Sequence, residues 1–480
     1  MKNRKVLLIE PPFYRLHSEH YGLWALPLWM GYLAGAVTRK ARWECRLFNA
    51  DYVKDRRSFD VEHLTGEGFS RYVRLLGDMS APQWDEIREL IAREKPGIVG
   101  VSVKSPSLAS AKAVARSVKA VGKAIVTVAG GPHATAAPGE LLGDGLFDFC
   151  IAGEGEKAFV SLLEALGSGE SAASLKSVVA IHDGSLHASP REAIEEDLDA
   201  LGFPHEALEE TLLGYQHYGA DAFSHLMASR GCPRRCFFCG SRQVWGTRVR
   251  CRSPRHVVSE LRALKALGIR HFHFDDDTFG VSPRYLKDLC SAINEGLPGI
   301  SWGCETHVSL VDKENLVAMK KAGCTVIQIG IESGSDTMLR GMNKGFTAEE
   351  ALRACGLIRD MGIRLEAFFM AGLPGETEEM LGETISMVRS LECDKVIYSI
   401  FTPYRGTEAY NYCREKGLIG DRYDPSLHSH QSPLNCFSGS MTLERFRERA
   451  RELESIVAEK NRYGAYVKAS PPDPSPSAPR

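Results

Sequence analysis

The sequence lacks an excess of charge of either sign. Lysine and arginine total 59 residues against 61 aspartates and glutamates, so the formal net charge is -2. A nearly neutral chain has no overall electrostatic attraction to nucleic acid or to an anionic membrane. We therefore expect no nucleic-acid partner, because such a partner would require a local basic patch.

A long hydrophobic run is also absent. The longest apolar stretch, residues 24–37, contains Pro27 and two glycines, and only four consecutive apolar residues precede Glu10. A membrane-spanning helix needs about 20 apolar residues, and a secretory signal needs an apolar region of at least about 7. The sequence thus predicts no membrane insertion and no export, and we expect a cytoplasmic location.

Thirteen cysteines are present in the 480 residues. Without a secretory signal, this content favours reduced thiols, with a few of them acting as metal ligands, over a disulfide framework.

The patterning predicts two α/β units. Short Val- and Ile-rich runs alternate with amphipathic helices in the first part of the chain, which indicates a parallel sheet covered on both faces, a doubly wound, Rossmann-like fold. Six further strand-helix units predict a partial (βα)6 barrel of the TIM type, with its chemistry at the carboxyl ends of the strands. The expected division is a Rossmann-like domain at 1–170, a linker at 171–218, the barrel at 219–417, a helical carboxyl-terminal region at 418–467 and a disordered, Pro- and Ser-rich tail at 468–480.

The carboxyl-terminal region contains one strongly amphipathic segment. Leu443, Phe446, Ala450 and Leu453 recur at helical spacing, so we expect a helix that packs across the barrel as a cap. The residues before it, including His428 and His430, form either a substrate loop or a simple connection.

Three cysteines carry the most specific signal. Cys232, Cys236 and Cys239 follow a predicted strand and are separated by three and then two residues, so their thiolates can converge on one iron-sulfur cluster. Three ligands leave one iron of a four-iron cluster open. A structural zinc site would need four ligands, and Cys251 is the only other thiol nearby.

This loop, with the aromatic Phe238 before the third cysteine, resembles the CxxxCxxC loop of the radical S-adenosylmethionine (SAM) superfamily. The resemblance implies a 4Fe-4S cluster on the three cysteines. It also implies SAM bound to the open iron and cleaved reductively to a 5′-deoxyadenosyl radical.

Later segments resemble SAM-binding segments of that family in the same order along the chain. They are Phe274–Phe279, Gly330–Ser335, Gly372–Thr377 and the closing loop Pro403–Thr407. The resemblance implies SAM contacts from Phe238, Asp276, Asp277, Glu332, Ser333, Gly372 and Pro374. For the aspartates, helix capping and loop solvation stay open as the alternative.

One position departs from the family pattern. His307 stands where related sequences commonly have arginine, so a titratable ring replaces a permanent charge. No catalytic role is assigned to His307, and the catalytic residues are unknown from the sequence.

The first unit resembles the cobalamin-binding domain that precedes the barrel in a large radical SAM subgroup. The resemblance implies cobalamin contacts from Pro11, Pro12, Ser102, Ser105, Gly130, Gly131, His133 and Glu154. No DxHxxG motif is present, so we expect no histidine ligand to cobalt through that motif. Plain turn roles for these residues stay open.

Together the resemblances imply a cobalamin-dependent radical SAM methyltransferase. It would act on an unactivated carbon, or phosphorus, of a small molecule through the 5′-deoxyadenosyl radical and methylcobalamin, with electrons from an external donor of the flavodoxin or ferredoxin type. An unactivated C–H bond cannot be deprotonated by a side chain near neutral pH, so radical chemistry is required.

Two alternatives remain. One is a non-methylating cobalamin-dependent radical SAM enzyme of the oxidative cyclase or rearrangement type. The other is a cobalamin-binding sensor or regulator. Methylthiolation of transfer RNA is disfavoured, because only Cys45 and Cys150 precede Cys232 and they form no second cluster motif.

Overall fold

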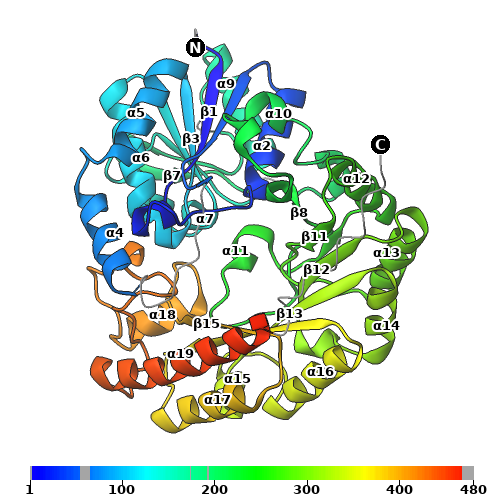
Figure 1. Cartoon of the computed structure of the whole chain (residues 1–480). Coiled ribbons are helices and arrows are strands. Elements are labelled where there is room, and N and C mark those ends of the chain that lie inside the picture. Colours follow the sequence, from blue (N-terminus) through cyan, green and yellow to red (C-terminus); the bar gives the residue numbers. More distant parts are fainter. Residues whose placement is uncertain (1–2, 55–64, 173, 192–193, 467–480) are drawn as a thin grey trace, which may run out of the picture.

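The computed structural model of the chain describes residues 3–54, 65–172, 174–191 and 194–466, so the tail predicted at 468–480 lies outside the described residues. Two α/β halves face each other across a central region that contains the short helix α11 (Ser241–Trp245) (Figure 1). No helix in the described part of the chain has the length and apolar character needed to cross a membrane.

A seven-stranded sheet forms the amino-terminal half. Its strand order is β2-β1-β3-β4-β5-β6-β7, and β1 to β5 run parallel. The order reverses between β1 and β3, which is the position where doubly wound sheets bind ligands. The strands are β1 (Lys5–Glu10), β2 (Glu44–Asn49), β3 (Ile98–Ser102), β4 (Val126–Gly130), β5 (Phe149–Ile151), β6 (Val178–His182) and β7 (Ser185–Ala188).

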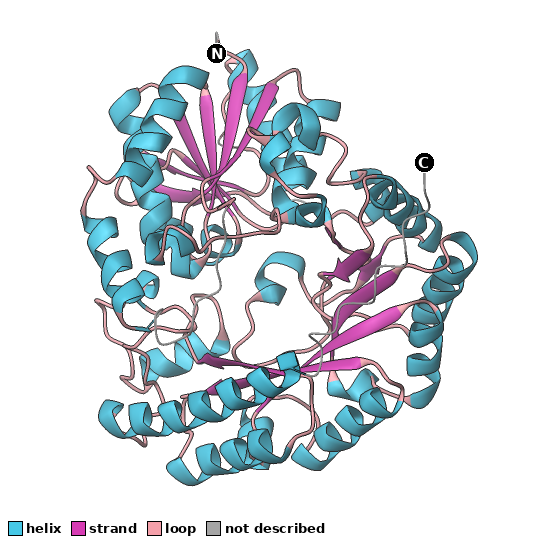
Figure 2. Cartoon of the chain, viewed as in Figure 1, coloured by secondary structure: helices cyan, strands magenta, loops and turns pink. Residues whose placement is uncertain are grey.

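Helices cover both faces of this sheet, as the doubly wound prediction requires (Figure 2). In β1, Val6 and Leu8 pack with the apolar side chains of α2 and α9, whereas Leu7 and Ile9 pack with those of α5 and α6. Successive strand residues point to opposite faces, so a continuous apolar run is buried on both. The helices are α1 (Tyr14–His17), α2 (Leu28–Lys40), α4 (Glu67–Gly77), α5 (Pro82–Glu94), α6 (Leu108–Val121), α7 (Pro132–Ala136), α8 (Pro138–Leu142) and α9 (Gly155–Ser168).

The region predicted as a linker contains the antiparallel hairpin β6-β7, which extends the sheet beyond β5. The connector interpretation missed this hairpin. Its turn residues, Asp183 and Gly184, both have left-handed backbone angles, with φ of 49° and 73°. An Asp-Gly pair between two short runs is the usual signal of a two-residue hairpin turn. The short helix α10 (Leu208–Thr211) follows before the second half begins.

A six-stranded parallel sheet in the order β15-β14-β13-β12-β11-β8 forms the predicted partial barrel. Its strands are β8 (His225–Leu226), β11 (His271–Phe274), β12 (Ser301–Thr306), β13 (Cys324–Glu332), β14 (Arg364–Ala371) and β15 (Lys395–Ile400). A separate two-stranded ribbon pairs β9 (Ser229–Arg230) with β10 (Arg250–Cys251). The outer helices are α12 (Pro254–Ala266), α13 (Pro283–Gly296), α14 (Lys313–Lys321), α15 (Asp336–Gly341), α16 (Ala348–Asp360), α17 (Glu378–Ser390) and α18 (Glu408–Glu415).

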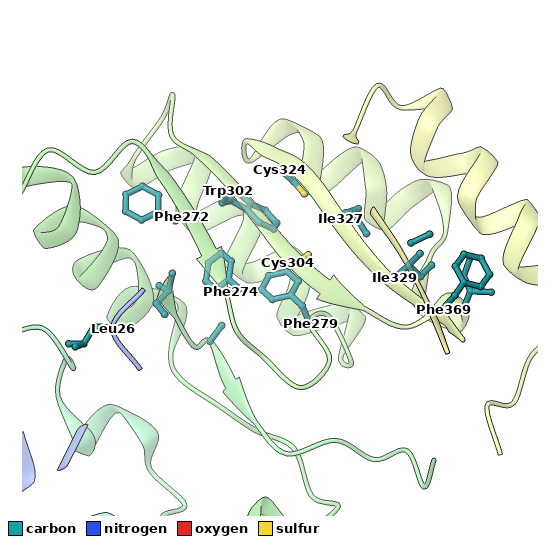
Figure 3. Packing of buried hydrophobic residues seen from close by; sticks show 14 of the residues in the cluster. Leu26, Phe272, Phe274, Phe279, Trp302, Cys304, Cys324, Ile327, Ile329 and Phe369 are labelled. Atoms are coloured by element: carbon teal, nitrogen blue, oxygen red, sulfur yellow. The ribbon is translucent and has the colours of Figure 1, made fainter. Parts of the chain in front are cut away.

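Aromatic packing fixes the middle of this barrel sheet. The ring centres of Phe274 and Phe279 each lie 5.3 Å from that of Trp302, and all three side chains are buried (Figure 3). The indole N–H of Trp302 donates to the backbone oxygen of Ala322 at 2.8 Å. This packing fixes the end of β11, and the loop that follows it, against the start of β12.

The last helix, α19 (Leu443–Tyr466), packs against β15 and α17. It lies along the edge of the barrel sheet and not across the barrel mouth, which corrects the expected cap (Figure 1). Phe446, Ala450 and Leu453 are buried as predicted, whereas Leu443, at the first turn, is exposed.

Candidate active site

The three candidate cluster cysteines lie in one loop that follows β9 and ends at α11. Cys232, Cys236 and Cys239 are all partly exposed, whereas most of the other cysteines, such as Cys304, are buried in the core. Strand β9 in turn follows β8, the first strand of the barrel sheet. The loop thus comes after the carboxyl end of a barrel strand, where the chemistry is expected.

The surroundings of Cys236 and Cys239 favour the neutral thiol. Burial, followed by the charges of neighbouring thiols, raises the pKa of both, and that of Cys239 reaches about 11. A bound cation reverses this effect, because it stabilises thiolates. Among the described residues, no three His, Cys, Asp or Glu side chains are close enough to share one metal ion.

Asp277 ties the two ends of the cluster loop together. One carboxylate oxygen accepts a hydrogen bond from the backbone N–H of Gly231 at 3.2 Å, and the other accepts from the hydroxyl of Ser241 at 2.6 Å. Asp276 is 2% exposed and accepts from the backbone N–H of Ala228 at 2.7 Å, and its burial raises its pKa to about 7. Both aspartates therefore position the loop, and their contact with SAM stays a prediction.

Two glutamates at neighbouring strand ends come together in the barrel interior. Burial, together with the charges of Asp275, Asp277 and Glu332, raises the pKa of Glu305 to about 7. Glu332 has φ of 71° and lies 3.1 Å from the ammonium of Lys344. A left-handed glutamate is strained, and such strain is often found at functional sites. These carboxylates are suited to an ammonium group such as that of SAM.

Glu305 and Lys344 were missed by the sequence analysis. Lys344 is nearly buried, and its ammonium lies 5.8 Å from the ring centre of Phe238 in the cluster loop. The backbone oxygen of Met342 also accepts from the N–H of Phe237 at 3.0 Å. The sequence marks Lys344 only by its position between Asn343 and Gly345 after a helix. This composition is typical of an ordinary turn, so it does not indicate a functional lysine.

Ser333 faces away from the barrel interior. Its hydroxyl is fully buried, lies 2.9 Å from that of Thr384 on α17 and accepts from the backbone N–H of Ser335. Ser333 lies in the turn that leads into α15, so its side chain joins the start of α15 to α17.

Gly372 and Pro374 belong to a tight turn after β14. Gly372 has φ of 78°, and its N–H donates to the buried carboxyl group of Glu376 at 2.6 Å. A Cβ at this position would lie 2.9 Å from the ring of Phe446 on α19. The turn is thus held from both sides, with Pro374 partly exposed at its tip.

His307 is almost fully buried at the end of β12. Its Nδ1 accepts from the backbone N–H of Ser309 at 3.2 Å. Burial, together with the charges of Lys344 and Arg234, lowers the pKa of His307 to about 3. The ring is therefore neutral near pH 7 and stabilises a turn.

A cavity of about 350 Å³ lies between the two halves. Its amino-terminal walls are largely apolar and come from β1, α2, β3, β4 and α9, with Leu8, Leu33, Val128 and Phe159 among the lining residues. Gly130 also lines it, and a Cβ added there would meet no protein atom within 4 Å. The glycine thus leaves room for a ligand at the switch point of the sheet, where a corrinoid tail fits.

The barrel half supplies the remaining wall of this cavity. Met227 and Arg230 come from just before the cluster loop, and Val244 and Trp245 come from α11 just after it. Asp275 completes this side. The cavity therefore touches both flanks of the cluster loop.

The predicted cobalamin contacts fall into three groups. Ser102, Gly130, Gly131 and Glu154 line the cavity, Ser105 lines a neighbouring one, and Pro11, Pro12 and His133 line neither. His133 is 1% exposed, and its ring lies 3.0 Å from the Ser105 hydroxyl and 3.3 Å from the Glu140 carboxylate. The buried ring therefore does not line either cavity.

The neighbouring cavity, of about 290 Å³, shares Lys104 and Pro132 with the first. Asp51 lines it with one carboxylate oxygen bonded to backbone N–H groups, and the other oxygen has no hydrogen-bond partner among the described residues. Burial raises the pKa of Asp51 to about 7. Tyr404 and His430 of the barrel half lie opposite, so this cavity is a candidate place for a polar substrate.

Comparison with known families gives two matches. Residues 226–388 match the family model of the radical SAM superfamily. Residues 20–163 match that of the B12 binding domain. The matches occur in the order that the sequence analysis expects.

Individual relatives span most of the chain. An uncharacterized methyltransferase of Pyrococcus horikoshii is 29% identical over 423 residues, covering 87% of this chain and 85% of that protein. The anaerobic magnesium-protoporphyrin IX monomethyl ester cyclase of Rubrivivax gelatinosus is 29% identical over 429 residues, covering 87% and 71%. The structure of the radical SAM methyltransferase TsrM of Kitasatospora setae, with cobalamin and a [4Fe-4S] cluster bound, aligns with a TM-score of 0.70 at 18% identity, covering 95% and 89%.

Proposed function

The chain is a radical SAM enzyme with an amino-terminal cobalamin-binding domain, and we propose that it transfers a methyl group to an unactivated carbon, or phosphorus, of a small molecule. One observation carries this proposal. The cavity suited to a corrinoid is walled by both flanks of the cluster loop, so a methyl carrier and a radical source would meet at one place.

The two cofactors divide the chemistry. When bound, the cluster and SAM supply a radical that removes a hydrogen atom, and the corrinoid supplies the methyl group. The chain's residues hold and shield these groups. Cys232, Cys236 and Cys239 would hold the cluster, Asp277 sets the loop, and Glu305 with Glu332 would accept hydrogen bonds from the ammonium of SAM.

The relatives support methyl transfer and keep one second candidate open. The Pyrococcus horikoshii relative is named a methyltransferase, whereas the Rubrivivax gelatinosus relative is named a cyclase at the same identity. A cyclase-type reaction would use the same cofactor sites. The products formed from SAM distinguish the two candidates.

The experiment is anaerobic reconstitution followed by product analysis. The holoenzyme, incubated with SAM, a strong reductant and candidate acceptors, is expected to form S-adenosylhomocysteine together with 5′-deoxyadenosine. Cys236→Ala should abolish both products, whereas the control Cys251→Ala should retain them. A turned-over acceptor without S-adenosylhomocysteine would refute methyl transfer, and a protein unable to cleave SAM at all would favour the regulator alternative.

Radical formation requires an electron from outside the chain. We propose a flavodoxin or ferredoxin as the donor, and a cytoplasmic location where the partly exposed thiols stay reduced. Replacing the chemical reductant by a reduced flavodoxin should sustain SAM cleavage.

A further inference from the structure

Arg230 belongs to both candidate cofactor sites. It is the last residue of β9, directly before Gly231 and Cys232, and its side chain lines the corrinoid cavity. It is 3% exposed, although a guanidinium carries a permanent charge. A buried arginine needs specific partners, and here they come from both halves of the molecule.

Aromatic rings enclose the Arg230 guanidinium. Its central carbon lies 4.8 Å from the ring centre of Tyr32 on α2 and 4.8 Å from that of Trp245 on α11. Tyr32 belongs to the amino-terminal half, and Trp245 belongs to the segment after the cluster loop. Both rings also line the cavity.

Ion pairs complete the connection. The Arg230 guanidinium lies 2.7 Å from the carboxylate of Glu156, at the start of α9. Its backbone pairs with that of Arg250, which forms a salt bridge with Glu154. Glu154 and Glu156 line the same cavity, so charges at the cavity wall hold the strand that leads into the cluster loop.

We propose that Arg230 is a positioning residue that couples the nucleotide tail of the corrinoid to the cluster loop. The inference rests on the proposed function, because it requires a corrinoid in the cavity. A tail that fills the cavity packs against Arg230 and Trp245 and restrains both flanks of the loop. By linkage, corrinoid binding then stabilises the cluster, and a loaded cluster tightens corrinoid binding.

The test measures iron loss from the cluster, not turnover. Reconstituted protein is treated anaerobically with an iron chelator, alone, with saturating hydroxocobalamin, or with cobinamide, which lacks the nucleotide tail. Hydroxocobalamin should slow iron release at least about 5-fold, the lower end of typical coupling between two sites. Cobinamide should slow it by less than about 2-fold. Equal protection by the two corrinoids overturns the proposal, and this comparison needs no variant.

Variants assign the coupling to the side chain. Arg230→Gln should lose the protection by hydroxocobalamin, and Arg230→Lys should recover part of it by restoring the charge. The matched control is Arg248→Gln, because Arg248 lies in the same region but forms an exposed ion pair with Glu196. Full protection in Arg230→Gln contradicts the assignment.

The outcome separates this inference from the proposed function. If hydroxocobalamin does not bind to the wild-type protein, the cobalamin-dependent function fails. If it binds and iron release is unchanged, only the coupling fails.

Discussion

Single buried side chains connect the two halves of the molecule. The Ser105 hydroxyl, the His133 ring and the Glu140 carboxylate form a continuous series of contacts, and Glu140 also forms a salt bridge with Arg405. Ser105 lines the second cavity after β3, and Arg405 follows the last barrel strand. The series thus fixes a cavity wall relative to the barrel.

Removing the central ring of this series should destabilise the protein. His133→Ala leaves Ser105 and Glu140 without their shared buried partner, which should lower the free energy of unfolding by about 1–3 kcal/mol. His133→Gln should recover part of the loss, since the amide of glutamine can form a hydrogen bond with either Ser105 or Glu140. Urea unfolding measures both, with the exposed His187→Ala as the control. Equal stability of His133→Ala and wild type would contradict the role.

Burial of the Glu376 carboxyl group should make the stability of the protein depend on pH. Burial raises its pKa from 4.5 in a free side chain to about 8. Between these values the folded protein holds more protons than the unfolded chain, so stability falls as pH rises through this window. Glu376→Gln keeps a neutral acceptor for Gly372 and should reduce the fall by up to about 1.4 kcal/mol per pH unit. Unfolding curves across this range measure the effect, and parallel curves for variant and wild type would contradict it. Glu379→Gln, exposed in the first turn of the adjacent helix α17, is the control.

At the scale of elements, α19 protects the free edge of the barrel sheet. The side chain of Asn461 accepts from the backbone N–H of Val396 and donates to its oxygen, both at 2.9 Å. In the described part of the chain, β15 has no neighbouring strand on this side. The helix therefore replaces the hydrogen bonds that a further strand would make.

Asn461→Ala should expose that edge. Loss of these bonds should speed amide exchange of Val396 about 10-fold, which corresponds to about 1.4 kcal/mol of local stability. Hydrogen-exchange mass spectrometry of peptides covering β15 measures the change. Glu459→Ala, exposed on the same helix, should leave exchange unaltered, and an unaltered rate in Asn461→Ala would refute the capping role.

Local sequence patterns predicted most of the helices and strands. The hairpin β6-β7 and the placement of α19 were not predicted correctly, for physical reasons. The six barrel strands and the three-cysteine loop depend on short spacings that are readable in the sequence. The β6-β7 hairpin was missed because its strands are short and β7 is exposed, so only the Asp183–Gly184 turn marks it. The placement of α19 was wrong because amphipathicity shows that a face is buried but not what covers it.

At the scale of the whole molecule, the site depends on packing between distant segments. Arg230 meets Tyr32, Glu156 and Trp245, and no local spacing relates these residues. The sequence therefore predicts the two sites separately but not the side chains that line both. The second cavity was hidden for the same reason, since its wall combines Asp51 with Tyr404.

The buried Glu156–Arg230 ion pair and the exposed Glu196–Arg248 ion pair should differ strongly in their effect on stability. Glu156→Gln leaves the Arg230 charge buried without its nearest partner, which should cost about 3 kcal/mol. Glu196→Gln removes only the exposed pair with Arg248, which should cost at most about 1 kcal/mol. Equilibrium denaturation compares the two, and Glu156→Gln should also separate the unfolding of the two halves into distinct transitions. Equal costs would show that the buried pair does not join them.

The shared wall of the corrinoid cavity also dictates an order of biogenesis. Residues from Leu8 to Phe159 emerge from the ribosome before the segment from Met227 to Trp245 that closes the cavity. The cavity wall is therefore complete only after the segment that ends at Trp245 has been made. A chain truncated before Met227 would lack the barrel side of this wall.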